Sequence, residues 1–204
     1  ALVRLGDRLL AVSDDALAAA WIEARTGAIT PLVLAGRGER LPKIEKPDLE
    51  AALVDANGML YILGSGSTDR RRRIVRVDTA RSVIEWLDRG TLYDALAGAL
   101  KGHTPNIEGA VLRGDVLTLF HRANGRDAGP SMTLDVPRAA LDGAEPRVLA
   151  SRRYDLGRAR GVSLTFTDAA ALAGCRALYV AVAEDSLDAV QDGPVVGAAI
   201  GVLD

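Results

Sequence analysis

The chain is poor in the residues that usually mark special chemistry. Its 204 residues include one cysteine and two histidines. A lone Cys175 excludes an internal disulfide framework and leaves the redox compartment open. The sequence also has no cysteine–histidine zinc spacing, no P-loop and no dinucleotide-binding fingerprint. These absences exclude zinc fingers, P-loop nucleotide-binding proteins and Rossmann-type dehydrogenases.

The chain also has no long apolar run and no excess of one charge. No stretch approaches the length of a membrane span. The formal net charge is −2, with acids and bases interspersed, which argues against a broad nucleic-acid surface. We therefore predict no nucleic-acid and no membrane partner, and the oligomeric state stays unknown. The absence of a visible signal peptide favours the cytoplasm, but Ala1 begins inside an expected strand, so the periplasm stays open.

The chain consists largely of short apolar runs that are separated by turn residues. Aromatic residues are only 4% of the sequence, so alanine, valine, leucine and glycine must fill the core. The most regular stretch is Asp48–Ser67, which contains an acid, a strand at 50–55, the turn Ala56-Asn57-Gly58, a second strand at 59–64 and a small polar end. The same pattern recurs at Asn106–Arg122. Such runs predict paired antiparallel strands.

A repeat of this unit predicts the fold class. The first leucines of successive second strands are separated, by subtraction of residue numbers, by 51, 57 and 61 residues: Leu9, Leu60, Leu117 and Leu178. A four-stranded unit at about this interval indicates an all-β protein, a β-propeller, and ranks a sandwich or barrel far behind. The expected blades of this single domain are residues 1–36, 47–90, 105–154 and 162–204. Because both ends cut the pattern, we expect these four blades to be part of a five- or six-bladed propeller.

Two stretches interrupt the regular pattern. Residues 15–25 are rich in alanine and fit a helix, but the repeat favours a strand at Leu17–Glu23. Residues 91–101 carry leucine and alanine at helical spacing and are followed by Gly102. We predict one short helix there, inserted between two blades.

Acidic residues at the start of the first strands predict a site. Glu50 and Asp168 lie ten residues before Leu60 and Leu178, and Glu108 lies nine residues before Leu117. In a propeller these three acids would converge around a central channel. Carboxylate oxygens suit Ca²⁺ or Mg²⁺, so these three acids are the expected metal ligands and no other cofactor is expected. For a small polar ligand, the predicted binding set adds Arg122 and Ser65, which end second strands on the same face. The alternative is structural, in which the acids accept backbone N–H bonds and hold blades together.

Catalysis is a further interpretation of the same face. Metal and base together could activate water for phosphoester or carboxylester hydrolysis, so if the chain is an enzyme it is a hydrolase. The candidate catalytic residues are Glu50, Glu108, Arg122 and His121. Ser65 lacks the strand–turn–helix context of a nucleophile elbow. A non-enzymatic interaction scaffold, using the loops 184–194 or 65–73, is the remaining alternative.

The motifs around these acids resemble a known group of proteins. Asp-Leu-Glu-Ala-Ala at 48–52 precedes Gly-Met-Leu-Tyr-Ile-Leu-Gly-Ser-Gly-Ser, and Asn-Ile-Glu-Gly-Ala at 106–110 precedes Leu-Thr-Leu-Phe-His-Arg. They are similar to uncharacterised bacterial β-propeller proteins, distantly related to esterase-like phytase propellers. The resemblance covers most of residues 45–186 and implies a propeller with a site on one face. Glu50, Glu108, Asp168 and Arg122 match its pattern, whereas Ala51 replaces the usual glycine.

Overall fold

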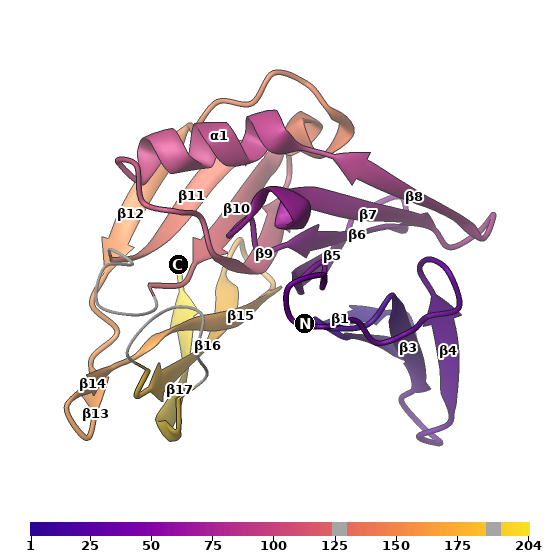
Figure 1. Cartoon of the computed structure of the whole chain (residues 1–204), viewed down its shortest axis with the longest axis horizontal. Coiled ribbons are helices and arrows are strands. Elements are labelled where there is room, and N and C mark those ends of the chain that lie inside the picture. The colour runs from indigo at the N-terminus through magenta and orange to yellow at the C-terminus, as the bar shows by residue number, and fades with distance from the viewer. Residues whose placement is uncertain (124–129, 187–192) are drawn as a thin grey trace. The chain divides into compact units, whose positions relative to one another are not determined.

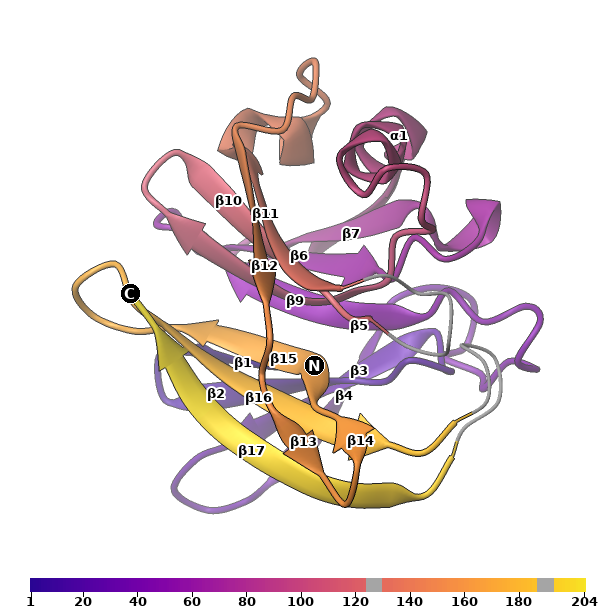
Figure 2. The same cartoon turned by 90° about the vertical axis from the view of Figure 1, so that its left-hand side faces the viewer.

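Four antiparallel sheets of the blade type make up most of the protein. The computed structural model describes residues 1–123, 130–186 and 193–204, and its contacts divide the chain into unit 1, Ala1–Gly90, and unit 2, Thr91–Asp204. Each unit holds two sheets in which consecutive strands are neighbours (Figures 1 and 2). The predicted class, an all-β propeller with one short inserted helix, is confirmed. The predicted blade boundaries and the total of five or six blades stay predictions.

The first sheet of unit 1 settles the ambiguity of the alanine-rich stretch. Its strands run in the order β1 (Leu2–Leu5), β2 (Arg8–Val12), β3 (Ala18–Glu23) and β4 (Ile29–Val33). The stretch is strand β3, because Ala19 and Trp21 alternate into the core while the strand pairs with neighbours on both sides. Burial and pairing outweigh the helix propensity of alanine.

The second sheet of unit 1 contains the most regular stretch of the sequence. Its strands are β5 (Leu49–Val54), β6 (Met59–Gly64), β7 (Arg73–Asp78) and β8 (Val83–Asp88), with a short 3₁₀ helix, η1 (Asp69–Arg71), before β7. In the β5–β6 turn, Asp55 Oδ1 accepts hydrogen bonds from the N–H groups of Asn57 and Met59, both at 2.9 Å. Gly58 closes the turn at a φ of 78°, which other residues rarely adopt.

The core of unit 1 joins its two sheets. Leu10 and Trp21 of the first sheet pack in one apolar cluster with Leu49 and Leu60 of the second. The indole Nε1 of Trp86 in β8 donates a 2.9 Å hydrogen bond to the carbonyl of Leu34. Both tryptophans of the chain therefore lie in unit 1, so tryptophan fluorescence reports on this unit.

Unit 2 begins with the predicted helix. Helix α1 (Gly90–Ala99) starts at the last residue of unit 1 and buries Leu92, Tyr93 and Leu96. The third sheet and its 3₁₀ helix follow: β9 (Ile107–Arg113), β10 (Val116–His121), β11 (Ser131–Pro137), η2 (Arg138–Asp142) and β12 (Ala150–Tyr154). The last elements are a small hairpin and a three-stranded sheet: β13 (Arg158–Ala159), β14 (Val162–Ser163), β15 (Thr165–Ala171), β16 (Ala177–Glu184) and β17 (Val195–Leu203).

Aromatic rings and one glycine join the two large sheets of unit 2. The ring of Phe166 makes edge-to-face contacts with Phe120, Tyr154 and Tyr179, with centroids 5.1, 5.5 and 5.2 Å away. At Gly109 in β9, an added Cβ would lie 2.8 Å from the backbone nitrogen of Ala169 in β15. Glycine at this position allows the first strands of the two sheets to approach closely.

Candidate functional site

The first strands of three sheets contain a β-bulge. In β5, Leu49 faces Gly64 and Ala51 faces Leu63, so Glu50 between them has no residue opposite. In β9, Glu108 is the extra residue in the same way. In β15 the extra residue is Thr167, and the predicted site residue Asp168 faces Val180. Because a bulge redirects a side chain away from the regular pleat, Glu50 and Glu108 are the acids that the backbone singles out.

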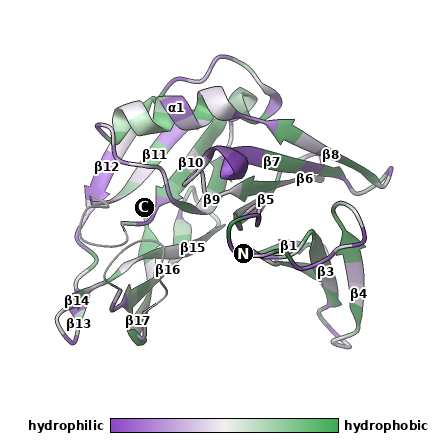
Figure 3. Ribbon diagram, in the orientation of Figure 1, coloured by the Kyte–Doolittle hydropathy of each residue, from purple (hydrophilic) through white to green (hydrophobic). Residues whose placement is uncertain are grey.

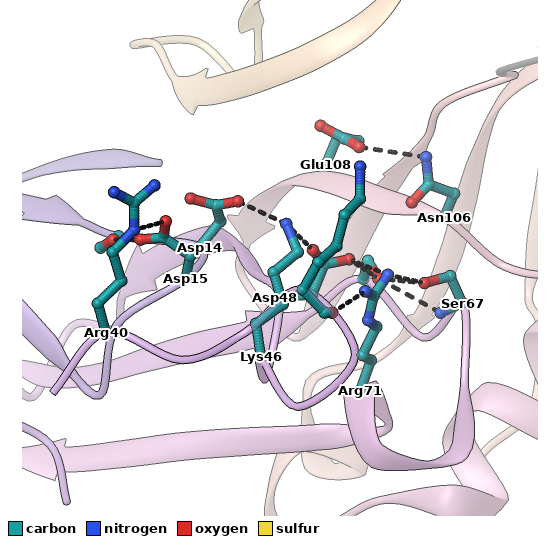
Figure 4. A network of polar contacts seen from close by, with 12 residues as sticks. Asp14, Asp15, Arg40, Lys46, Asp48, Ser67, Arg71, Asn106 and Glu108 are labelled. Atoms are coloured by element: carbon teal, nitrogen blue, oxygen red, sulfur yellow. Dashed lines mark hydrogen bonds and ion pairs between the residues drawn. The ribbon is translucent and has the colours of Figure 1, made fainter. Parts of the chain in front are cut away.

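In unit 1, the buried Asp48 is the centre of a polar network, which we call the Asp48 cluster: Asp14, Lys46, Asp48, Glu50, Ser65 and Arg71. The Asp48 carboxylate is 2.7 Å from Lys46 Nζ and 2.9 Å from Arg71 Nη1. The hydroxyl of Ser65, which is fully buried, donates a 2.6 Å hydrogen bond to it. Lys46 Nζ also lies 2.6 Å from Asp14 Oδ2, so the ammonium group bridges two carboxylates (Figure 4).

The local backbone brings these groups together. Asp48 adopts a left-handed φ of 55°, which aspartate tolerates better than most residues. Gly64, at the end of β6, lies so close to the η1 segment that an added Cβ would be 2.2 Å from the Arg71 carbonyl oxygen. This close approach places the Arg71 side chain beside Asp48. Although Arg71 belongs to a run of four arginines, Arg70–Arg73, its side chain is only 18% exposed.

Glu50 is the acid that the network leaves uncompensated. Among the described residues its carboxylate accepts no hydrogen bond and forms no ion pair, although Asp14, Asp48 and Glu50 each offer an oxygen within 4.8 Å of the others. Burial, followed by the negative charges of Asp48 and Asp14, raises the pKa of Glu50 to about 7. The positive charges of the Ala1 amino group and Lys46 oppose this shift without cancelling it.

Lys46 stays charged in this environment. Burial disfavours its ammonium form, but hydrogen bonds to Asp14 and Asp48 outweigh burial and raise the pKa of Lys46 well above its usual value. A lysine in this state is a fixed positive charge, so it is unsuited to act as a nucleophile or base. Its role is to hold two carboxylates close to Glu50.

Unit 2 contains a separate network, the Arg122 cluster: Asn106, Glu108, Arg122 and Glu184. The Arg122 guanidinium donates a short hydrogen bond to Glu184 and lies 3.6 Å from Glu108 Oε2. Asn106 Nδ2 donates to Glu108 Oε1 at 3.1 Å (Figure 4), and the N–H of Gly193 donates to Glu184 Oε1 at 2.7 Å. The cluster connects the bulge of β9 and the end of β10 to the end of β16.

The remaining predicted residues have structural contacts. His121 is buried, and its Nδ1 accepts a 3.1 Å hydrogen bond from the backbone of Asn106, so a neutral ring carries its proton on Nε2. Asp168 Oδ1 accepts a 2.7 Å bond from the N–H of Ala169. The structure thus brings Glu108 and Arg122 together in unit 2 and Glu50 and Ser65 into one network in unit 1. The predicted ring of Glu50, Glu108 and Asp168 stays a prediction.

Six members of these networks were not among the predicted site residues: Asp14, Lys46, Asp48, Arg71, Asn106 and Glu184. Asp14 lies two residues after the end of β2, at the same count from Leu9 as Ser65 from Leu60 and Arg122 from Leu117, so the repeat could have identified it. Glu184 ends β16, one residue after the corresponding position. Lys46 lies in a loop and Arg71 in η1, and the strand pattern carries no information about where side chains outside the strands point.

Removing the Arg122 guanidinium should destabilise unit 2. The side chain of Arg122 is 12% exposed and those of Glu108 and Glu184 are 10% and 13% exposed, so Arg122→Met removes a guanidinium that lies beside two largely buried carboxylates. We expect a loss of about 3 kcal/mol in the free energy of unfolding. Chemical denaturation followed by far-UV circular dichroism would measure it, and hydrogen exchange should show faster exchange in β9, β10 and β16.

Two further variants make this measurement specific. Arg153→Met removes an exposed arginine from β12 in the same sheet and should change stability by less than about 0.5 kcal/mol. Adding Glu184→Gln to Arg122→Met removes one uncompensated carboxylate and should recover part of the loss. Equal effects of Arg122→Met and Arg153→Met would contradict a stabilising role for the cluster.

The sheets, their order and the bulged first strands place the chain among the β-propeller proteins. Over residues 1–204 it matches, and belongs to, a family of unknown function, DUF6929. The predicted membership of an uncharacterised propeller family is therefore confirmed. The bacterial source and the likeness to esterase-like phytases stay predictions. No curated protein sequence matches the chain.

Two solved structures with a similar chain course have low sequence identity to this chain. An exo-1,5-alpha-L-arabinanase from a bovine ruminal metagenomic library has 13% sequence identity to this chain and a TM-score of 0.46. The match covers 98% of this chain and 71% of the arabinanase chain. The computationally designed Ika8 protein has 11% identity and a TM-score of 0.32, with coverages of 98% and 73%. Within the described residues, no helix has the length and apolar character needed to cross a membrane.

Proposed function

We propose that unit 1 of this β-propeller protein binds a divalent cation through Asp14, Asp48 and Glu50. The observation that carries the proposal is the spacing of three carboxylate oxygens, which all lie within 4.8 Å of one another. One calcium ion with bonds of about 2.4 Å spans oxygens up to about 4.8 Å apart. Small movements of the side chains would therefore bring one ion into contact with all three groups.

The charges around the three acids support a cation more than an anion. Lys46 and Arg71 balance Asp14 and Asp48, whereas Glu50 has no cationic partner at hydrogen-bond distance among the described residues. A bound cation would give the Glu50 carboxylate the counter-charge that the free protein does not supply. It would also compete with the Lys46 ammonium for Asp14 and Asp48, which keeps the affinity moderate.

Calcium suits the geometry better than magnesium. The carboxylates come from the bend after β2, a left-handed residue and a bulge, so they are irregularly arranged. Calcium accepts six to eight oxygen ligands in variable geometry, whereas magnesium requires a near-regular octahedron and retains its water. We therefore expect Ca²⁺ to bind more tightly than Mg²⁺.

Calorimetric titration of the whole chain with Ca²⁺ tests this function. Binding heat is expected at about pH 8, and because Glu50 has a pKa of about 7, the affinity should be about tenfold lower at about pH 6. Glu50→Gln should abolish the heat. Asp7→Asn, which removes a carboxylate whose side chain is 72% exposed in the same unit, should leave it unchanged. If wild-type protein gives neither heat nor a change in melting temperature, the proposed function is wrong.

A hydrolase is the second candidate, favoured by one observation. A carboxyl group with a pKa of about 7 is suited to give and take protons at neutral pH, as a general acid or base must. Chromogenic phosphoesters and carboxylesters, assayed with and without Ca²⁺, are the appropriate probes. Activity that persists in Glu50→Gln would remove Glu50 from the catalytic role.

The scaffold alternative rests on two loops. In the loop 65–73, Ser65 and Arg71 are engaged in the Asp48 cluster, whereas Thr68, Asp69, Arg70 and Arg73 are exposed. Residues 187–192 of the loop 184–194 lie outside the described residues. The interaction scaffold stays a prediction, which pull-down with a loop-deleted variant would test.

A further inference from the structure

The ammonium group of Lys46 lies where a cation bound to Asp14 and Asp48 would lie. Its Nζ is 2.6 Å from Asp14 Oδ2 and 2.7 Å from Asp48 Oδ1, between the two carboxylates (Figure 4). Calcium lies about 2.3 to 2.6 Å from its oxygen ligands, so a calcium ion in contact with both acids needs nearly the same place. The lysine ammonium and a metal ion are therefore alternative occupants of one position.

Burial and the local backbone keep the ammonium group in this position. The side chain of Lys46 is 13% exposed and that of Asp48 is 8% exposed. The backbone N–H of Lys46 donates a 3.0 Å hydrogen bond to the carbonyl of Pro42. The neighbouring strands β5 and β6, whose ends adjoin Asp48 and Ser65, are predominantly apolar (Figure 3). Charges attract each other more strongly in such surroundings than in water, so an incoming ion must outcompete a firmly bound group.

The charges of the cluster determine which ions can displace the ammonium group. Sodium and potassium carry the same charge as the ammonium, so they gain no attraction when they replace it beside Asp14 and Asp48. A divalent ion brings one further positive charge. Glu50, which forms no ion pair among the described residues, adds its own attraction to that charge. Only a divalent ion therefore gains from the exchange.

Given the cation site proposed above, on which this inference rests, we propose that Lys46 is the specificity-determining residue of the site. Its ammonium group occupies the site in the free protein, excludes monovalent cations and is displaced by Ca²⁺. On displacement, Lys46 Nζ leaves both carboxylates and moves into water, whereas Arg71 keeps its 2.9 Å contact with Asp48. Without the Lys46 ammonium the site would be open to monovalent ions as well.

Calorimetry of Lys46→Met tests this selectivity. Methionine has a similar length and no charge, so Ca²⁺ should bind the variant at least about tenfold more tightly than the wild type. The comparison is made in NaCl and in tetramethylammonium chloride, both at about 0.15 M, because the two salts screen charges equally and only Na⁺ is small enough to enter the site. The wild type should bind Ca²⁺ equally in both salts, whereas Lys46→Met should bind at least about threefold more weakly in NaCl. Lys43→Met, which removes an exposed lysine of the same loop, should behave as the wild type does.

Amine labelling of the wild type gives a second measurement that needs no variant. An acylating reagent should label the largely buried Lys46 slowly in the free protein and several-fold faster with Ca²⁺ bound. The exposed Lys43 should be labelled at the same rate in both states. Mass spectrometry of the separate peptides measures the two rates.

The possible results distinguish the role of Lys46 from the proposed function. If the wild type binds Ca²⁺ but Lys46→Met binds it no more tightly, or if Lys46 labelling is unchanged by Ca²⁺, the role of Lys46 is wrong and the cation site stands. Equal Ca²⁺ affinity of Lys46→Met in the two salts would overturn the exclusion of monovalent ions. Binding by Lys46→Met alone would make Lys46 a permanent occupant, which overturns both its displacement and the proposed function. Binding by neither protein would overturn both proposals.

Discussion

Glu50→Gln should stabilise the free protein by about 3 kcal/mol at about pH 8, because the ionised carboxylate is the unfavourable form in the fold. Burial and the charges of Asp48 and Asp14 raise the pKa of Glu50 from 4.5 to about 7. Glutamine keeps nearly the same volume without the charge, with an NH₂ donor in place of one acceptor oxygen. Urea unfolding followed by tryptophan fluorescence would measure the effect, since Trp21 and Trp86 both lie in unit 1.

The pH dependence follows from the same shift. The folded state holds the Glu50 proton more tightly than the unfolded state, so between about pH 4.5 and 7 the folded state binds more protons. The contribution of Glu50 to the free energy of unfolding therefore falls as pH rises through this window and levels off above the folded pKa. This fall should be present in the wild type and absent from Glu50→Gln.

Asp7→Asn is the matched control for this comparison, because Asp7 is an exposed carboxylate of unit 1 with only a 4.0 Å ion pair to Arg25. The free energy of unfolding of Asp7→Asn should depend on pH in the same way as that of the wild type. A loss of stability in Glu50→Gln at about pH 8 would show instead that the charged carboxylate holds the fold together. In that case the structural interpretation of the strand acids, as locks between blades, would be correct.

Gly64→Ala should cost about 3 kcal/mol or more, since its new Cβ would lie 2.2 Å from the carbonyl oxygen of Arg71. Backbone atoms have little room to yield, so the η1 segment must move. Arg71 would then lose its 2.9 Å contact with Asp48, leaving that buried carboxylate with Lys46 as its remaining ion-pair partner in the described residues. Urea unfolding followed by tryptophan fluorescence measures the loss in unit 1.

Gly98→Ala provides the control for the extra methyl group. Gly98 lies in helix α1, and an added Cβ there meets no atom within 4 Å. Alanine should be neutral or stabilise by up to about 1 kcal/mol, because it is the better helix former. If Gly64→Ala is tolerated equally well, the tight packing of η1 against β6 is wrong.

The sequence predicted the propeller class because strand alternation and turn residues are local signals that recur with the repeat. Even the alanine-rich strand β3 followed from the repeat, against the intrinsic preference of alanine. The hairpin β13–β14 was not predicted, since its strands are two residues each and too short to show alternation. Short elements of this kind depend on the packing of their neighbours.

The candidate site was predicted less completely than the fold. Counting back from the phased leucines selected Glu50 and Glu108, which are both bulge residues, but selected Asp168 where the bulge residue is Thr167. Residue counting cannot locate the position at which a strand slips by one residue. Lys46 reaches Asp48 from a loop and Arg71 reaches it from η1, whose position depends on the close contact at Gly64.

The bulges have a consequence for how this family can change. A bulge residue has no partner across the sheet, so its side chain is not part of the pairing that holds the blade together. Within one chain the position is occupied by glutamate in β5 and β9 and by threonine in β15, while the ladder continues on either side. The first strands β5, β9 and β15 thus each offer a place where binding chemistry can be exchanged between relatives at small cost to folding.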